Sequence, residues 1–118
     1  MWTYRQHDGE LTHGGEFVGT GYSGKGNCRN SPSSQNIEGY GPIPQGIYRI
    51  GQAYDDPHLG PCVMHLDPQP GTNTYGRSLF RVHGDDARHD ASHGCIILGP
   101  SLRLIIATSA DRDLTVVA

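Results

Sequence analysis

Turn-forming residues punctuate the whole chain and leave only short segments between them. The 118 residues include 17 glycines and 8 prolines, and both residue types mark turns and breaks in regular structure. Such punctuation is more typical of a β-rich fold than of a helix bundle. The length suits one domain, and neither a linker nor an internal repeat is evident. We therefore expect a single compact, mainly β domain over residues 1–118.

Segments that alternate polar and apolar residues predict the strands, which we expect to pair mainly antiparallel. The first two are expected over 1–7 and 16–22, with Asp8-Gly9 as a hairpin turn. Further strands are expected over residues 47–50, 62–66, 79–83 and 114–117. The polar stretch 23–36 between them is typical of a long surface loop that could border a site.

One short helix is expected, over residues 101–109. Pro100 can open a helix at its first turn, and Leu102, Ile105 and Ile106 then share one helical face. This helix would follow Cys95, the residue around which the candidate site is built.

The charge and hydropathy of the chain exclude two classes of partner. The formal net charge is -3, so no large positive field would attract a nucleic acid. No apolar run approaches the ~20 residues that span a membrane, so we expect no membrane insertion. Residues 1–8 lack the apolar stretch of a secretory signal. We expect a protein made in the cytoplasm without a signal peptide, which would need another route to act outside it.

The segment 81–98 carries the chemistry. Cys95 follows His93-Gly94 directly and lies twelve residues after a second His-Gly pair, His83-Gly84. A thiol needs a nearby base to react near neutral pH, because the thiolate is the nucleophile. We therefore predict that Cys95 is a nucleophile and that His83, at the end of an expected strand, is its base. The plainer alternatives are a buried structural cysteine and a packing histidine.

The residues next to Cys95 predict how a reacting carbonyl would be held. Gly94 would let a substrate come close to the main chain, where backbone N–H groups around Cys95 could stabilise an oxyanion. His93 competes for the role of base, but its position favours shaping the oxyanion pocket. His83 would need a partner that fixes its tautomer. A backbone carbonyl or one of three aspartates could serve: Asp85, Asp86 or Asp90.

Two arginines flank this segment. Arg77 or Arg81 could hold a substrate carboxylate through its planar guanidinium. The alternative is that both are solvated strand charges.

A zinc site is a rival interpretation of the same residues. His83, His89, His93 and Cys95 could form a His/Cys cluster. Their spacing does not match a common finger pattern, and no C-x-x-C pair accompanies them. We therefore expect neither a metal nor a cofactor.

The three cysteines leave at least one free thiol, because their number is odd. Cys28 and Cys62 could form one disulfide in an oxidising compartment. All three could equally be reduced, since the sequence does not show whether the geometry permits a bond.

Two motifs together resemble a known enzyme family. Arg81-Val-His83-Gly84, followed by Ser92-His93-Gly94-Cys95-Ile96, resembles the signature of the YkuD-type L,D-transpeptidases. The upstream Gly41-Pro-Ile-Pro-Gln-Gly-Ile-Tyr48 is similar to the Pro-x-Gly-x-Phe/Tyr turn and strand of those enzymes. The resemblance places Tyr48, with Arg77 and Arg81, among the expected substrate-binding residues.

A narrower group matches more of the chain. With Tyr22-Ser-Gly-Lys-Gly26 and Arg77-Ser-Leu-Phe-Arg-Val-His83-Gly84 included, the pattern resembles L,D-transpeptidase-like effectors that bacteria deliver by type VI secretion. The likeness extends from about residue 20 to residue 100. It implies delivery to the periplasm of target bacteria, a cognate immunity protein and a secretion-machine component as partners.

The family resemblance implies peptidoglycan chemistry on stem tetrapeptides. Members cleave the bond between the L-centre of meso-diaminopimelate and the terminal D-alanine through an acyl-enzyme, which water, a D-amino acid or a stem amine then resolves. Carried over by position, Cys95 would be the nucleophile and His83 the base. His93, Gly94 and Cys95 would frame the oxyanion hole, and Ser92 would brace the turn.

Two departures from the housekeeping pattern refine this expectation. The gap from His83 to Ser92 is shorter, and Ile97 stands where many transpeptidases carry Asn or Arg. Both favour a carboxypeptidase or D-amino-acid exchange over efficient cross-linking. The alternatives are a non-catalytic cell-wall-binding module and a phage-derived cell-wall enzyme.

Overall fold

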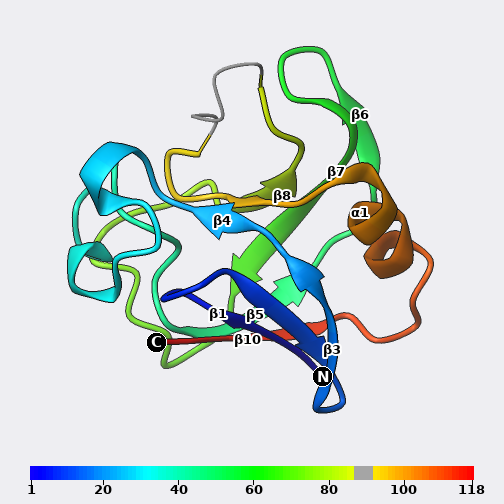
Figure 1. Cartoon of the computed structure of the whole chain (residues 1–118), viewed down its shortest axis with the longest axis horizontal. Coiled ribbons are helices and arrows are strands. Elements are labelled where there is room, and N and C mark those ends of the chain that lie inside the picture. Colours follow the sequence, from blue (N-terminus) through cyan, green and yellow to red (C-terminus); the bar gives the residue numbers. More distant parts are fainter. Residues whose placement is uncertain (87–91) are drawn as a thin grey trace.

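The computed structural model describes residues 1–86 and 92–118 and shows a mainly β domain with one α-helix (Figure 1). The expected aspartate Asp90 and the expected zinc ligand His89 lie outside the described residues. The strands are β1 (Trp2–Arg5), β2 (Glu10–His13), β3 (Glu16–Thr20), β4 (Tyr22–Ser23), β5 (Gly46–Ile50), β6 (Tyr54–Asp56), β7 (Gly60–Pro68), β8 (Arg81–His83), β9 (Ile96–Ile97) and β10 (Asp113–Val117). The helix α1 spans Pro100–Ala107, and two 3₁₀ turns, η1 (Gly26–Cys28) and η2 (Pro32–Ser34), interrupt the long polar loop.

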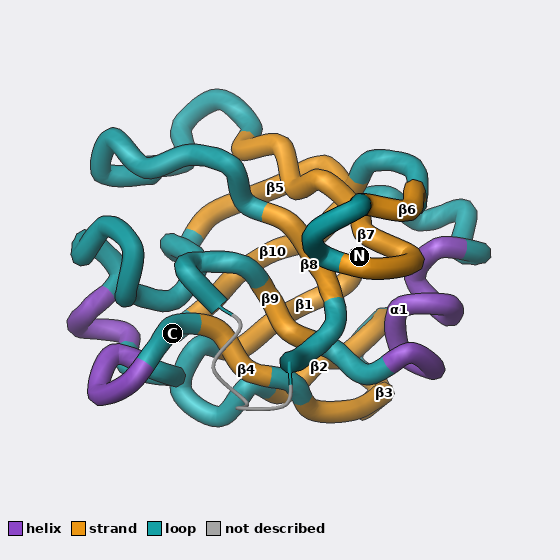
Figure 2. Tube along the Cα trace, turned by 90° about the horizontal axis from the view of Figure 1, so that it is seen from above, coloured by secondary structure: helices purple, strands orange, loops and turns teal. Residues whose placement is uncertain are grey.

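The strands form one curved sheet that nearly closes on itself. Its order is β3-β2-β1-β10-β5-β7-β8-β9-β4, with β6 paired to β7. β3 and β4 therefore lie at opposite ends of this order, although only Gly21 separates them in sequence. Figure 2 shows β9 between β8 and β4, with α1 beside one end of the sheet. The expectation of a mainly β, mainly antiparallel domain is confirmed.

Two strand pairs run parallel, and both depend on long connections. β1 pairs with β10, which sets the first and last strands of the chain side by side, and β8 pairs with β9. The connection between β8 and β9 begins at Gly84, directly after His83, and ends with His93-Gly94-Cys95. The pairing of distant segments is what places that connection beside the polar loop before β5.

Alternation along the strands builds the core. In β1 and β10 every second side chain is buried, as the register pairs Trp2 with Leu114 and Tyr4 with Val116. Val82 of β8 and Ile96 of β9 join the same apolar cluster and are paired with each other. Residues on either side of them must then face away from the core, because successive side chains in a strand point to opposite faces.

The N-terminal strands differ from the sequence prediction. Asp8-Gly9 does turn the chain, but the partner of β1 is β2, and the chain turns again at Gly14-Gly15 to form β3. A single hairpin between 1–7 and 16–22 is therefore wrong. Gly9 adopts φ 73°, and a Cβ there would lie 1.8 Å from the carbonyl oxygen of Gly21, so the first turn is packed against the β3–β4 junction.

The helix also differs from expectation in the face it buries. α1 buries Arg103 and Ile106 and packs Leu102 against the core, whereas Ile105 is 47% exposed. The guanidinium of Arg103 donates a hydrogen bond to the carbonyl oxygen of Leu98 at 2.6 Å. That bond gives the buried charged group an acceptor, so an arginine takes an inward position on α1 that apolar periodicity alone assigns to Ile105.

Candidate active site

The register of β8 and β9 brings the predicted nucleophile and base to one face of the sheet. Val82 pairs with Ile96, and His83 pairs with Ile97. Arg81 and Cys95 each lie one position earlier, so they are neighbours across the two strands. Arg81, His83 and Cys95 therefore share the face opposite the core.

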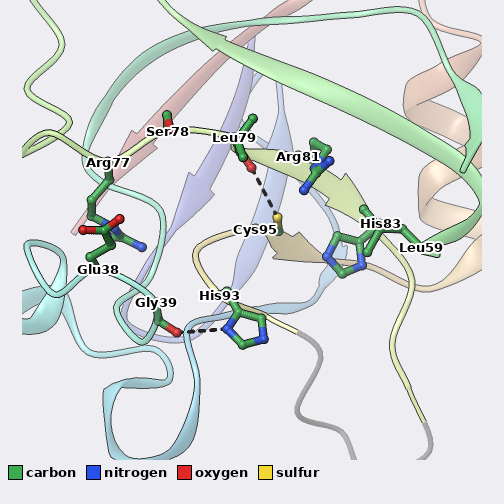
Figure 3. A pocket seen from close by; sticks show the side chains of 10 residues that line it. All are labelled: Glu38, Gly39, Leu59, Arg77, Ser78, Leu79, Arg81, His83, His93 and Cys95. Atoms are coloured by element: carbon green, nitrogen blue, oxygen red, sulfur yellow. Dashed lines mark hydrogen bonds between the residues drawn. The ribbon is translucent and has the colours of Figure 1, made fainter.

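These side chains surround a cavity of about 270 Å³ (Figure 3). Its floor comes from β8 and Cys95, and its walls come from the loop before β5, the loop before β8 and the turn between β6 and β7. The lining residues are Glu38, Gly39, Leu59, Arg77, Ser78, Leu79, Arg81, His83, His93 and Cys95. The cavity meets a second one on the far side of His83 and His93, which extends toward Asp85 and Asp86. The arrangement is a groove with the sulfur in its floor.

Cys95 is held as a neutral thiol. Its side chain is only 6% exposed, and its Sγ donates a hydrogen bond to the carbonyl oxygen of Leu79 at 3.8 Å. Burial raises the pKa of Cys95, because a low-dielectric surrounding disfavours the thiolate. The main chain and side chain of Arg81 and the charge of Arg77 act in the opposite direction. Deprotonation of Cys95 therefore needs a base. The positive charges of Arg81 and Arg77 would then stabilise the thiolate that forms.

His83 has the protonation state of such a base. It is 2% exposed, and its Nδ1 lies 2.8 Å from the carbonyl oxygen of Gly84. A carbonyl oxygen only accepts, so Nδ1 carries the hydrogen and Nε2 keeps its lone pair. Burial lowers the pKa of His83, the charges of Arg81 and Arg103 lower it further, and the Gly84 carbonyl and Asp85 oppose them. The ring is consequently neutral near pH 7 and able to take a proton.

Ser92 fixes the turn that carries Cys95. Its buried Oγ donates to the carbonyl oxygen of Cys95 at 2.6 Å and accepts the N–H of Gly24 at 2.9 Å. It also accepts the N–H of Gly94 at 3.3 Å. The Ser92 hydroxyl thus bridges two residues within the turn and also connects the turn to the loop before β5.

Only glycine fits at position 94. Its φ of 115° lies in a region that residues with a Cβ rarely adopt. A Cβ there would also lie 2.4 Å from Nη2 of Arg77. The glycine of the His93-Gly94-Cys95 motif is therefore a geometric requirement of this turn.

The family relationship agrees with this geometry. The sequence profile of the Tlde1 domain matches residues 18–112. The chain belongs to the Tlde1 domain family. Tlde1 domains form a family of type VI secretion effectors, so the predicted relationship to secreted antibacterial effectors is confirmed. No curated protein sequence is significantly similar to the chain.

The Tlde1 match includes every residue of the groove, but the structure separates the expected substrate-binding residues. Arg77 is buried, and its guanidinium donates to three carbonyl oxygens, those of Gln35, Gly41 and Pro42. These bonds hold the loop before β5 under Gly94. Arg77 therefore supports the loop beside the site, and its guanidinium is not free to bind a substrate carboxylate.

Tyr48 does not reach the groove. It lies fully buried on β5, its hydroxyl donates to the carbonyl oxygen of Pro44 at 2.8 Å, and its ring meets Phe80 edge-on at 5.8 Å. The expected contact of Tyr48 with substrate is corrected, because its side chain packs in the core. Tyr48 instead supports the turn over residues 41–46 from below, through its hydrogen bond to Pro44.

His93 lies at the mouth of the groove. It is exposed, and its Nδ1 lies 3.1 Å from the carbonyl oxygen of Gly39. Figure 3 shows its ring below Cys95, on the side of the loop that carries Gly39. The shared face of β8 and β9 favours His83 over His93 as the base, and His93 is placed to border the reacting group.

The sequence did not reveal the role of Leu79. This residue adopts φ 65° without being glycine, is 70% exposed at the groove and offers its carbonyl to Cys95. Nothing in the sequence indicates a left-handed leucine at this position, which lies two residues before β8. The partner of His83 was left open among a carbonyl and three aspartates, and the structure places the Gly84 carbonyl there.

The structure bears on the two alternatives left open for the cysteines and on the zinc interpretation. Cys28, Cys62 and Cys95 are all free thiols. Within residues 1–86 and 92–118, no group of three or more His, Cys, Asp or Glu side chains is arranged to hold a metal ion. In the same described part of the chain, no helix has the length and apolar character needed to cross a bilayer.

Proposed function

We propose that this Tlde1 domain is a cysteine-dependent L,D-carboxypeptidase or L,D-transpeptidase that acts on peptidoglycan stem tetrapeptides. One observation carries the proposal. A neutral His83, with Nε2 available, shares a strand face and a groove with the buried thiol of Cys95. Together with the type VI effector family, this arrangement supports acyl transfer by a thiol.

The first step transfers a proton and forms a thioester. His83 Nε2 takes the thiol proton, the thiolate attacks the carbonyl carbon of meso-diaminopimelate, and the imidazolium gives the proton to the leaving amine of D-alanine. The amide C–N bond breaks as the C–S bond forms. The positive charges of Arg81 and Arg77 favour the thiolate during this step.

The main chain of the Cys95 turn is assigned to the oxyanion. His93, Gly94 and Cys95 frame the position next to the sulfur, and Ser92 braces their turn. The N–H of Gly94 is directed to Ser92, so the N–H groups of His93 and Cys95 are the proposed donors. In the second step, water or the amine of a D-amino acid attacks the thioester and returns Cys95 to the thiol.

The type VI family supports delivery to the periplasm of another bacterium, where stem peptides are present. The proposal includes a cognate immunity protein in the producing cell and a component of the secretion machine as partners. Directing the chain to the periplasm of a host should arrest growth, and the Cys95→Ala variant should not.

The test of the activity is a product analysis. Purified protein is incubated with tetrapeptide muropeptides and the products are identified by mass spectrometry, with and without an added D-amino acid. We expect loss of D-alanine, or its exchange, with the wild type and with Cys28→Ala, and neither with Cys95→Ala. Cys28 is a suitable control because it is a free thiol outside the groove. Equal behaviour of wild type and Cys95→Ala would contradict the proposal, and sacculus binding without turnover would favour a non-catalytic module.

A further inference from the structure

Arg81 is the cation closest in register to Cys95. The two residues are neighbours across the parallel strands β8 and β9, whose backbones are about 4.8 Å apart in such a pair. Its guanidinium lines the same cavity as the sulfur, and Figure 3 shows it beside Cys95. Its charge lowers the pKa of His83 and opposes the raised pKa of Cys95, which is consistent with this position.

The half-buried guanidinium of Arg81 acts on the sulfur of Cys95 but donates to no oxygen of the described residues, in contrast to the buried guanidinium groups of Arg77 and Arg103. Arg77 donates to three carbonyl oxygens and Arg103 to one. No oxygen acceptor in residues 1–86 and 92–118 hydrogen bonds the side chain of Arg81, and its Nε is buried without a partner. The charge of Arg81 contributes to the lowered pKa of Asp56, but the two side chains form no ion pair. A buried donor without an acceptor is costly, so this geometry indicates a group that a ligand completes.

The planar arrangement of donors in the Arg81 guanidinium indicates the chemistry of such a ligand. A guanidinium pairs best with a planar oxyanion that accepts two parallel hydrogen bonds, and a carboxylate has this shape. Glu38, the carboxylate that lines the same cavity, lies near Arg77 instead and leaves the Arg81 side positive.

The proposed substrate carries a carboxylate at the required distance. This step rests on the proposed function. In a tetrapeptide the bond to be cleaved is the last one, so the free α-carboxylate of D-alanine lies one residue from the attacked carbonyl. One residue spans about 3.8 Å between Cα atoms, which is comparable with the separation of neighbouring strands. A carbonyl over Cys95 would thus place the terminal carboxylate within reach of Arg81.

We propose that Arg81 binds the free α-carboxylate of the terminal D-amino acid and thereby restricts the reaction to the last bond of the stem peptide. A longer stem has an amide where this carboxylate stands, and an amide leaves the guanidinium unpaired. The same contact would bind the carboxylate of an incoming D-amino acid, because the acceptor occupies the position that the leaving group vacates.

The experiment compares two substrates that differ only at this carboxylate. One is the stem tetrapeptide ending in D-alanine, and the other is the same peptide ending in D-alaninamide. For the wild type we expect kcat/KM to favour the acid by roughly 10- to 100-fold, the range of a charge-assisted hydrogen bond. In Arg81→Met the ratio should approach one, because activity on the acid falls more than activity on the amide. Arg81→Lys should keep part of the preference, since it retains the charge without the fork.

A matched control and a separate readout keep the outcomes distinct. Arg49→Met removes an arginine from β5 that pairs with Asp113 at the surface, and it should leave the ratio unchanged. If Arg81 acted only on the sulfur, Arg81→Met would lower activity on both substrates equally and the proposal would be overturned. A wild type without preference for the acid would overturn it as well.

Binding tests the inference even if turnover fails. In the Cys95→Ala background, which cannot form the acyl-enzyme, the Kd of the acid and of the amide are measured by calorimetry with Arg81 present and with Arg81→Met. A preference for the acid that disappears with Arg81→Met supports the inference, and equal Kd values with Arg81 present refute it. Absence of turnover in the wild type refutes the proposed function alone. If Arg81→Met does not fold, the same ratio measured for Arg81→Lys and Arg81→Gln decides.

Discussion

The two parallel strand pairs of this molecule are built alike and differ in what lies over their outer faces. β1 and β10 bury Trp2 and Leu114 inward, and β8 and β9 bury Val82 and Ile96 in the same way. Arg5, on the outer face of β1, is exposed and pairs with surface carboxylates. The outer face of β8 is instead covered by loops.

That cover changes the chemistry of the residues beneath it. Hydrogen bonds to Asp8 raise the pKa of Arg5 at the surface, whereas burial is the largest cause of the lowered pKa of His83 and the raised pKa of Cys95. The strand pairing supplies position, and the loops supply desolvation. A reactive pair needs both, because an exposed thiol and imidazole would keep ordinary pKa values.

The largest effect is expected where the outer faces differ most. His83→Gln keeps the size and polarity of the side chain but removes the base, so D-alanine release should fall by about 10²- to 10⁴-fold. Arg5→Gln, on the outer face of β1, should leave the rate unchanged. Rates are measured by mass spectrometry with substrate in excess. Comparable losses in both variants would show that the outer faces are not functionally distinct.

Truncation of a buried side chain should destabilise the protein on the inner face of either parallel strand pair. Ile96→Ala removes buried atoms from β9 and should lower the free energy of unfolding by about 2–5 kcal/mol. Val116→Ala in β10 removes fewer atoms from the same core and should cost less, in the same direction. Urea denaturation measures both. A loss below about 1 kcal/mol for Ile96→Ala would mean that the inner face of β9 is not packed as described.

The link between the loop and the turn should show in a smaller effect. Ser92→Ala removes the hydroxyl that joins Gly24, Gly94 and Cys95, and we expect a loss of about 1–3 kcal/mol in unfolding free energy. Activity should fall as well, because the turn carries the sulfur. Ser33→Ala, which changes an exposed serine in η2, is the control. Unchanged activity in Ser92→Ala would show that the turn holds its shape without the hydroxyl.

The smallest effect is the pH dependence of stability. The pKa of His83 is lower in the folded state, so its contribution is present above about pH 6.5 and is lost as the pH falls through the unfolded pKa toward the folded one. The pKa of Cys95 is raised, so its contribution is present at neutral pH and is lost as the pH rises above the unfolded pKa of about 8.5. Chemical denaturation across this range should show both limbs.

The two limbs can be assigned by substitution. His83→Gln should flatten the acid limb alone, and Cys95→Ala should flatten the alkaline limb alone. An acid limb that persists unchanged in His83→Gln would attribute it to the exposed histidines and carboxylates instead.

Local patterns predicted the β-rich architecture and singled out the His83 and Cys95 that the structure places on one face of the sheet. The density of turn residues indicated a β-rich domain, and the spacing of His83 and Cys95 indicated a thiol with its base. These features depend on residue type and short spacing, which the sequence displays directly. The register of β8 and β9 brings the two residues to one groove, as that interpretation requires.

Other features depend on partners that only the fold supplies. Arg77 and Arg81 look equivalent in sequence, but the loop before β5 presents three carbonyl oxygens to Arg77 alone. Ile105 fits an apolar helical period, yet α1 buries Arg103, which bonds to the Leu98 carbonyl, and leaves Ile105 exposed. The second turn at Gly14-Gly15 separated β2 from β3, where one long hairpin was expected. In each case a contact across the fold outweighed a local pattern.

A sulfur that rests protonated and almost wholly covered has a further consequence. Small electrophiles and oxidants react with exposed thiolates, so this atom is slow to be alkylated or converted to a sulfenic acid while the groove is empty. The thiol of Cys95 should therefore stay reduced for longer in an oxidising environment than an exposed cysteine would, and under the proposed mechanism a substrate that enters the groove meets an unmodified sulfur.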